Sequence, residues 1–417
     1  MPEDGLAATW MAGEPGQLDE FHANPIARII MKTDRMHLRF APAALAAILA
    51  VSPSMGAPEK TTLKDAYKGD FLIGAALNNS HFEETDAQAA ALVKAQFSAI
   101  SPEDVLKWQS LHPRPGVYDF TAADRYVEFG LRNGMFIVGH NLVWHNETPK
   151  WVFEDDKGNP TDRDTLLARM REHILTVVGR YKGKIGGWDV VNEALSYDGS
   201  MTKNSWEKII GDDYLLKAYQ FAHEADPQAQ LYYNEFYYYH EFGRQSAAKR
   251  TAAIALVRKL QAQGIPIAAV GLQGHYGLST PTLDEVEETI TEFSKLGVKV
   301  MITEMDIDVL PPVKEVEFSE QPMHIPLNAQ IDPYASGLPD SVQQQLARRY
   351  ADLFAVFLKH RDVIQRVSFW GVTDATSWLN EYPVYGRTNY PLLFDRADQP
   401  KPAFDAVIAV ARSASVR

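Results

Sequence analysis

The sequence contains no cysteine. Disulfides, zinc–thiolate sites, iron–sulfur clusters and thiol nucleophiles are therefore excluded, and the fold must rely on its apolar core. The chain also contains no run of basic residues, and its formal net charge is -13. Because nucleic acids and anionic membranes attract clustered Lys and Arg, we expect neither as a partner. A neutral or weakly charged substrate fits this charge best.

Signatures of several other enzyme classes are missing as well. A doubly wound nucleotide-binding sheet usually has a glycine-rich phosphate turn after its first strand, but residues 71–78 read FLIGAALN. No Gly-x-Ser-x-Gly elbow occurs, which argues against a serine esterase. The histidines near the predicted strand ends lack the local spacing of metal ligands. We therefore predict neither a metal nor any other cofactor.

The N-terminal region has the pattern of a secretory signal. Residues 37–57 read HLRFAPAALAAILAVSPSMGA, which combines a basic start, an apolar stretch too short to span a bilayer, and small residues suited to cleavage. We predict a signal peptide over residues 36–57, a non-structural extension over 1–35, and a catalytic domain over 58–417. The alternatives are a membrane anchor or a misread loop. The prediction implies a secreted protein, periplasmic or extracellular, with no membrane association after cleavage.

From residue 58 onward, short apolar runs alternate with longer amphipathic segments, and no linker interrupts them. The predicted strands are 71–75, 97–101, 136–139, 187–191, 231–234, 268–272, 298–302 and 367–370. The predicted helices include 86–94, 165–178, 214–225, 244–263, 283–296 and 341–359. Eight strand–helix units in one domain predict an α/β fold closed into a single (β/α)8 TIM barrel, with an open doubly wound sheet as the alternative. The proline-rich segment 308–340 breaks this rhythm, and such long loops tend to be functional.

Polar residues gather directly after the apolar runs, where a parallel barrel places its active site. Glu193 follows the fourth run and Glu304 follows the seventh, so the two should face each other nearly across the ring. Paired carboxylates suit retaining glycoside cleavage, in which one protonates the leaving oxygen and the other attacks the anomeric carbon, at a separation of about 5–5.5 Å. Trp144, Trp370 and Trp378 fall on the same predicted face, where aromatic rings can pack against the C–H faces of sugars.

Five segments, in this order, resemble the endo-xylanases of glycoside hydrolase family 10. They are GHNLVWH at 139–145, WDVVNEA at 188–194, GLQGH at 271–275, ITEMDI at 302–307 and FWGVTD at 369–374. The resemblance extends from about Tyr67 to Val407. It implies endo-hydrolysis of β-1,4-xylosidic bonds in xylan and xylo-oligosaccharides, by a protein that we expect to be a monomer.

The resemblance also implies roles for individual residues. Glu193 matches the general acid/base of the family, and Glu304 matches the nucleophile. Asn192 is expected to bond the sugar 2-hydroxyl, His275 to orient the nucleophile, and Asp306 to support that histidine. The residues expected to bind sugar are Glu103, Asp104, Lys107, His140, Trp144, Gln273, Trp370 and Trp378.

Three positions depart from the family pattern. Asp104 stands where asparagine is usual, and Val138 stands where a basic residue is usual. Residues 234–237 read NEFY, where the family usually has NDYN. These departures leave the fine substrate preference open, especially at the distal and leaving-group sides of the cleft.

Two other functions stay open. The same fold and chemistry could act on another β-glucan, although Trp370 and Trp378 favour xylan because they crowd the hydroxymethyl arm of glucose. A non-catalytic xylan-binding protein is the second alternative, and the presence of both carboxylates argues against it. Some residues also have structural interpretations: the tyrosines of 232–239 form either a sugar platform or core, and Asp374 contacts sugar or holds its loop. The 308–340 loop is expected to wall one side of the cleft.

Overall fold

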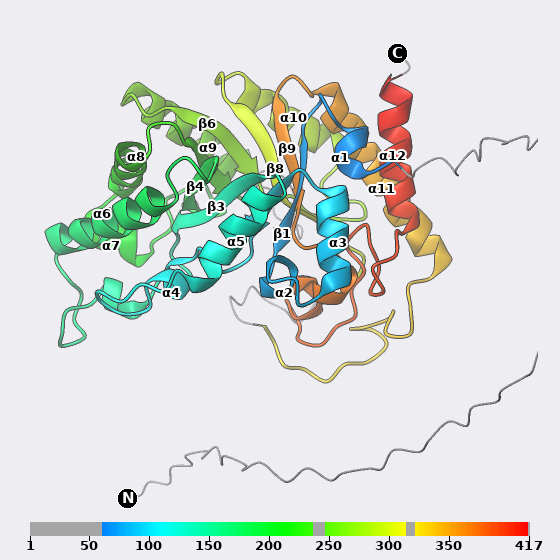
Figure 1. Cartoon of the computed structure of the whole chain (residues 1–417), viewed down its shortest axis with the longest axis horizontal. Coiled ribbons are helices and arrows are strands. Elements are labelled where there is room, and N and C mark those ends of the chain that lie inside the picture. The colour runs from blue at the N-terminus through cyan, green and yellow to red at the C-terminus, as the bar shows by residue number, and fades with distance from the viewer. Residues whose placement is uncertain (1–60, 237–246, 314–321, 416–417) are drawn as a thin grey trace, which may run out of the picture. The chain divides into compact units, whose positions relative to one another are not determined.

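The computed structural model describes residues 61–236, 247–313 and 322–415. The predicted extension (1–35) and signal peptide (36–57) lie outside these residues and stay predictions. Within the described part of the chain, no helix is both long and apolar enough to cross a membrane. The same part forms a ring of parallel strands with helices around it (Figure 1).

Eight parallel strands make up the ring. They are β1 (Leu72–Leu77), β2 (Ala99–Pro102), β3 (Phe136–Val143), β4 (Gly187–Asn192), β5 (Gln230–Glu235), β6 (Ile267–Leu272), β8 (Lys299–Asp308) and β9 (Ile364–Phe369). β1 pairs with both β2 and β9, and β6 pairs with β8, so the sheet closes on itself. The short β7 (His275–Gly277) pairs with the end of β8. The predicted (β/α)8 barrel is confirmed, and each predicted apolar run overlaps one strand of the ring.

Helices follow the strands and cover the outside of the ring (Figure 1). They are α1 (Leu63–Ala66), α2 (Asn79–Phe82), α3 (Ala87–Gln96), α4 (Trp108–Leu111), α5 (Thr121–Arg132), α6 (Arg163–Arg180), α7 (Ser205–Ile210), α8 (Tyr214–Ala225), α9 (Ala247–Ala262), α10 (Leu283–Ser294), α11 (Asp340–Lys359) and α12 (Pro402–Ser415). Each of the six predicted helices overlaps one of these. At α10, Thr282 and Glu285 form a reciprocal capping box that satisfies the first free amides of the helix.

Bulky side chains fill the core around the strands. Trp188 on β4 is buried, and a Cβ atom added at Gly139 on β3 would come within 2.0 Å of its ring. Position 139 therefore requires glycine for this packing. Tyr232 and Tyr233 on β5 are fully buried and belong to the core, so neither is a sugar platform. Residues 237–239 of the same tyrosine run lie outside the described residues.

Two buried histidines stack on aromatic rings near α6. The ring centroids of His173 and Trp108 are 3.7 Å apart, and those of His112 and Tyr118 are 3.8 Å apart. Within the described residues, no hydrogen-bond partner reaches a ring nitrogen of either histidine. Burial lowers the pKa of His112 to about 4, and burial together with the nearby His112 lowers the pKa of His173 well below its usual range. Both imidazoles are therefore neutral in the folded protein at neutral pH.

Acidification should destabilise the fold through these histidines. In the unfolded chain a histidine has a pKa of about 6.5. Between pH 6.5 and about 4, the unfolded state therefore binds a proton that folded His112 does not bind. The free energy of unfolding then falls by up to about 1.4 kcal/mol per pH unit for each such histidine. We expect His112→Phe, which keeps a ring in the stack, to make this pH dependence shallower by up to that slope in urea titrations.

An exposed histidine provides the control. His324 is exposed, so His324→Phe should retain the parental pH dependence of unfolding. If His112→Phe lost as much stability as the parent between pH 6.5 and 4, the neutral buried state of His112 would be wrong.

Candidate active site

Backbone hydrogen bonds continue from strand to strand at the carboxyl ends of β4, β5, β6 and β8. The N–H of Glu193 donates to the carbonyl of Asn234 at 3.1 Å, and the N–H of Gln273 donates to the carbonyl of Glu235 at 3.0 Å. The N–H of Glu304 donates to the carbonyl of Gln273 at 2.7 Å. We call these three bonds the strand-end ladder. It places Glu193 and Glu304 at the same end of the barrel, as predicted.

Glu193 comes directly after β4 and is half-buried. Its φ angle of 57° lies in the left-handed region, which is uncommon for a residue other than glycine. The indole Nε1 of Trp144 donates to its Oε2 at 2.8 Å, and the amide of Gln273 donates to its Oε1 at 2.8 Å. Two residues that were predicted to bind sugar therefore also hold the carboxyl group of Glu193.

Glu304 lies on β8 and is 6% exposed. Asn234 donates to its Oε1 at 2.6 Å, and His275 Nε2 lies 3.3 Å from its Oε2. Burial alone would raise the pKa of Glu304, but the hydrogen bond from His275, the charges of His140 and His275, and the Asn234 bond outweigh it. The pKa of Glu304 therefore lies below its ordinary value, and the group is ionised at neutral pH.

His275 sits between two carboxylates. Its Nδ1 lies 3.1 Å from both carboxylate oxygens of Asp306, while its Nε2 faces Glu304. Burial opposes the charge of His275, but Asp306 and then Glu304 outweigh burial and raise the pKa of His275 well above its usual range. Both ring nitrogens can then donate, so the ring is a cation beside Glu304. The indole of Trp378 donates to Asp306 at 2.7 Å, a contact that the sequence did not predict.

Asn234 joins the two predicted catalytic strands, although sequence reasoning did not place it among the site residues. Its side-chain nitrogen donates to Glu304 and also to Asn192 Oδ1 at 2.8 Å, and its side-chain oxygen accepts from the hydroxyl of Thr303 at 2.7 Å. These bonds fix the orientation of the Asn192 amide, because Asn192 uses its oxygen here and keeps its NH2 group for another partner. The position of Asn234 at the end of a strand was the available signal.

His140 and Trp370, both predicted to bind sugar, are in contact. The rings of His140 and Trp370 lie edge to face with centroids 5.4 Å apart. His140 is buried, and its Nδ1 lies 2.9 Å from the buried Asp189, which was not predicted as a site residue. Asp189 therefore orients the imidazole of His140.

Lys107, one of the residues predicted to bind sugar, lies beside Trp144. Lys107 Nζ is 5.3 Å from the centroid of the Trp144 ring and forms a 2.7 Å ion pair with Asp104. The Lys107 side chain is 12% exposed and that of Asp104 is 67% exposed. Burial first, and then the charge of Asp104, raise the pKa of Glu103 to about 8, while Lys107 opposes this rise. Lys107 and its partner Asp104 therefore lie next to Trp144, whose indole donates to the carboxyl group of Glu193.

Residues 62–410 match the profile of Glycosyl hydrolase family 10. The chain belongs to glycosyl hydrolase family 10. Endo-1,4-beta-xylanase A of Xylanibacter ruminicola is 40% identical to it over 352 residues, which are 84% of this chain and 94% of that protein.

Solved structures of family 10 members agree with this assignment. A family 10 endoxylanase retrieved from a sugarcane soil metagenome is 43% identical, covers 84% of this chain and 100% of its own, and superposes with a TM-score of 0.78. An intracellular xylanase of Thermoanaerobacterium saccharolyticum, solved as a mutant with xylotriose, is 32% identical with a TM-score of 0.72. That match covers 84% of this chain and 99% of the other.

Asp374 has a structural role in this family 10 chain. The sequence left open whether Asp374 contacts sugar or holds its own loop. It is fully buried, pairs with the buried Lys401 at 2.8 Å, and accepts the N–H of Leu392 at 2.8 Å. Burial raises the pKa of Asp374 to about 6, and Lys401 opposes this rise. Asp374 therefore holds the loop after β9.

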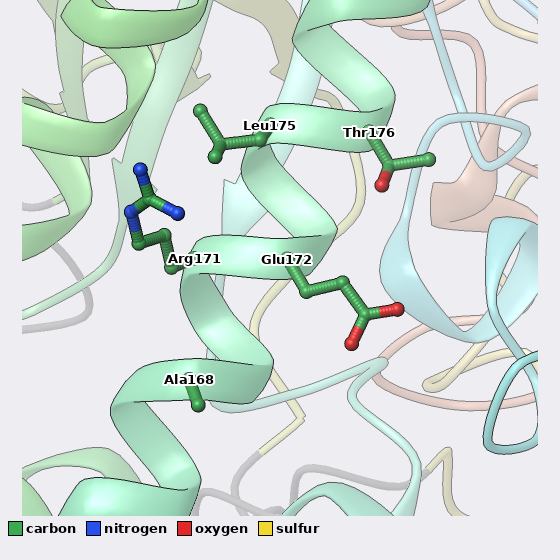
Figure 2. Close-up of a pocket in the computed structure, with 5 residues that line it drawn as sticks. All are labelled: Ala168, Arg171, Glu172, Leu175 and Thr176. Atoms are coloured by element: carbon green, nitrogen blue, oxygen red, sulfur yellow. The ribbon is translucent and has the colours of Figure 1, made fainter.

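Two further observations delimit the site of this family 10 protein. Among the described residues, no group of three or more His, Cys, Asp or Glu is arranged to hold a metal ion. A hollow of about 410 Å³ lies elsewhere, against α6, and Figure 2 shows its five lining residues projecting from successive turns of that one helix. They are Ala168, Arg171, Glu172, Leu175 and Thr176. None of them lies at a strand end, so this hollow is separate from the strand ends that carry Glu193 and Glu304.

Proposed function

We propose that this protein is an endo-1,4-β-xylanase that cleaves xylan with retention of configuration, with Glu193 as acid/base and Glu304 as nucleophile. The observation that carries the proposal is the connection of both carboxylates through Gln273. Its amide bonds Glu193, and its carbonyl accepts the N–H of Glu304. Glu304 is buried beside the His275 cation, whereas Glu193 is only half-buried. Two carboxyl groups in such different surroundings suit the two different roles.

The reaction follows from these surroundings in two displacements. In the first, a carboxylate oxygen of Glu304 attacks the anomeric carbon, the glycosidic C–O bond breaks, and Glu193 gives its proton to the departing oxygen. In the second, Glu193 takes a proton from water, and the resulting hydroxyl attacks the same carbon and releases Glu304. Two inversions give net retention. Trp144 and Gln273 donate to different oxygens of Glu193, and a protonated carboxyl group can still accept at both, so the two bonds can persist while the proton is directed at the departing oxygen.

Other side chains are proposed to hold the sugar. Asn192 presents its NH2 group, since its oxygen is engaged by Asn234, and a donor at this place suits the sugar 2-hydroxyl. Trp370 and Trp378 are half-buried, and Trp378 is tied to Asp306, so their rings can form walls against the apolar faces of a xylose unit. Lys107 and Glu103 are proposed to bind the next, distal sugar.

Xylan is the proposed polymer because the relatives described above carry xylanase names and one of them was solved with xylotriose. The test is product analysis on glucuronoxylan by mass spectrometry, together with initial rates on xylan and carboxymethylcellulose. We expect oligosaccharides with new reducing ends and a much higher rate on xylan. A higher rate on carboxymethylcellulose would favour a glucanase, and binding of xylan without new reducing ends would favour a non-catalytic protein.

Removing His275 should shift the acidic limb of the activity profile. The acidic limb of kcat/KM reports ionisation of the nucleophile in the free enzyme. Because the His275 hydrogen bond and charge help to hold the pKa of Glu304 low, His275→Asn should raise that pKa and move the limb to higher pH. The measurement is kcat/KM from pH 3 to 8 on an aryl xylobioside. His145→Asn, the same change at a residue outside these contacts, should leave the limb in place; an unmoved limb in His275→Asn would contradict the role of His275.

The segment 308–340 is proposed to wall one side of the cleft, as its sequence suggested. Its described part joins the loop after β9: Met323 N–H donates to the Pro383 carbonyl at 3.0 Å, and Tyr385 N–H donates to the Met323 carbonyl at 3.1 Å. That loop also carries Trp378, whose ring stacks on Tyr382 with centroids 5.2 Å apart. The two loops therefore form one surface that is continuous with Trp378.

Tyr385 on this surface is a site to test. The residue is 49% exposed, and its ring centroid lies 4.9 Å from that of His324. If a long xylan chain packs on it, Tyr385→Ala should raise KM for xylan by roughly 3- to 10-fold, the loss of one aromatic contact, and leave KM for an aryl xylobioside unchanged. Leu131→Ala removes an equally exposed apolar side chain from α5 and should change neither. Equal effects of Tyr385→Ala on KM for the long and the short substrate would contradict a contact of Tyr385 with the long xylan chain alone.

Export is also proposed, and it rests on residues 36–57 alone. Sequencing the N-terminus of protein recovered from outside the cytoplasm should find a start near residue 58. An uncleaved N-terminus in an active cytoplasmic protein would exclude this proposal.

A further inference from the structure

A buried ion pair lies directly behind the segment that carries Glu193. Lys249, in the first turn of α9, pairs with Glu235 at the end of β5 at 2.9 Å, and both side chains are 0% exposed. Neither residue belongs to the contacts proposed above for sugar or for the nucleophile. Burying two charges is costly unless further hydrogen bonds complete their environment, so the contacts of this pair indicate what it is for.

Three groups donate hydrogen bonds to Glu235, in addition to its ion pair with Lys249. Its Oε2 accepts from the N–H of Leu195 at 3.1 Å and the hydroxyl of Tyr233 at 2.7 Å. Its Oε1 accepts from the N–H of Phe236 at 3.0 Å and faces the ammonium group of Lys249. A carboxylate accepts at both oxygens, whereas an amide in its place would turn a donor toward two of these partners. Burial raises the pKa of Glu235, and the adjacent Lys249 opposes this rise.

Lys249 makes a second connection to the same segment. Its ammonium group lies 3.5 Å from the centroid of the Phe236 ring and 5.5 Å from that of Tyr197. Leu195 and Tyr197 stand two and four residues after Glu193. The pair therefore holds this segment twice, through the Leu195 amide and through the Tyr197 ring.

This anchoring matters because of the backbone of Glu193. Its φ of 57° is unfavourable for a glutamate and persists only where the surroundings impose it. On the N-terminal side, the N–H of Glu193 is held by the carbonyl of Asn234. On the C-terminal side, the Leu195 bond to Glu235 is the matching restraint. Both restraints come from neighbouring residues at the end of β5.

We propose that Lys249 and Glu235 form a positioning device for the acid/base group, which keeps the Glu193 carboxyl aimed at the leaving oxygen by holding residues 193–197 in their turn. The proposal rests on the acid/base role of Glu193 given above. Glu304 is held separately by Asn234 and His275. Loss of the pair should therefore impair proton donation and leave nucleophilic attack largely intact.

Leaving groups of different acidity separate these two functions. Dinitrophenolate departs without a proton, whereas phenolate needs one from Glu193. We expect Lys249→Met to lower kcat/KM for phenyl β-xylobioside by roughly 10- to 100-fold, the scale of a misplaced catalytic group, and to change kcat/KM for the dinitrophenyl substrate by less than about 3-fold. Lys249→Arg, which keeps the charge, should recover part of the loss.

Two further variants keep the test decisive. Lys249→Met leaves a buried carboxylate without its cation, so the double variant Lys249→Met/Glu235→Met removes both charges while still removing the anchor. It should show the same dependence on the leaving group. Lys401→Met breaks a different buried lysine–carboxylate pair, which holds the loop after β9, and should affect both substrates equally.

The outcomes distinguish this inference from the proposed function. Equal losses on both substrates in the double variant, no loss at all, or the same selective loss in Lys401→Met would each overturn the positioning role. Glu193→Ala is measured alongside as the reference. If Glu193→Ala also lost equal activity on both substrates, the acid/base assignment of Glu193 itself would be wrong. If Glu193→Ala lost activity selectively on the phenyl substrate and the Lys249 variants did not, only the positioning role of Lys249 and Glu235 would be wrong.

Discussion

Replacing Glu304 by alanine is expected to lower kcat on xylan by roughly 10⁴-fold or more, the scale seen when a covalent nucleophile is removed. The reason is geometric as well as chemical, because Asn234 and His275 hold the carboxylate and keep it ionised. Removing it leaves no other carboxylate among the described residues that contacts both of these groups. Reducing-sugar release from xylan measures the effect, and Glu304→Gln preserves the size of the side chain.

Azide provides a stereochemical check on this variant. A small anion can enter the space left by the Glu304 carboxylate and attack the anomeric carbon once. We therefore expect azide to restore cleavage of dinitrophenyl β-xylobioside by Glu304→Ala with formation of the α-glycosyl azide. Xylan hydrolysis by Glu304→Ala at the parental rate would remove the nucleophile assignment, and a β-glycosyl azide would show that a covalent intermediate still forms.

Replacing Glu193 by alanine should lower kcat/KM for phenyl β-xylobioside and for xylan by roughly 10²- to 10⁴-fold, the usual contribution of general acid catalysis. For the dinitrophenyl substrate kcat/KM should change little, because its leaving group needs no proton. Hydrolysis of the intermediate also needs Glu193 as a base, so kcat for this substrate should fall. Steady-state kinetics on both aryl substrates measure these effects.

Azide gives the opposite stereochemical result here. In Glu193→Ala the glycosyl–Glu304 ester still forms, and azide then replaces water in the second step, so the product should be the β-glycosyl azide. Trp144 and Gln273 lose their shared acceptor in this variant, so its circular dichroism spectrum is compared with that of the parent as the control for folding. An equal loss of kcat/KM on both aryl substrates would show that Glu193 does not act as the acid.

The strands and the main site were readable from the sequence because parallel barrel strands are buried on both faces. Each therefore stands out as a continuous apolar run, and the residues after it lie at one end of the ring. Glu193, Glu304 and His275 could be placed in this way. The closure of the ring, with β1 against β9, could be inferred only from the count of eight units.

Residues that act through a neighbouring strand were not predictable in the same way. Asn234 and Asp189 have their partners on other strands, so their roles depend on which strand ends meet and in which register. Lys249 lies on a helix in a segment without any motif, and only the folded chain brings it to Glu235. Conversely, Tyr232 and Tyr233 looked like a platform in sequence, but the strand places both inside the protein.

The departures from the family pattern become partly interpretable in the structure. Asp104 is exposed and forms its ion pair with Lys107, whereas the position of Glu235 is buried and crowded with donors. The departure at Asp104 therefore affects an exposed ion pair, whereas the departure at Glu235 affects the contacts that support the segment after Glu193. Residue type alone could not separate these two cases.

The strand-end ladder has a consequence for redesign of this enzyme. The ladder consists of main-chain hydrogen bonds, which form whatever side chain a residue carries, and the peripheral segment 322–339 takes no part in it. Grafting different sequences onto this segment should change which polymers are accepted while the turnover of a minimal aryl substrate stays constant. The architecture thus separates selectivity from bond breaking, so each can be altered independently.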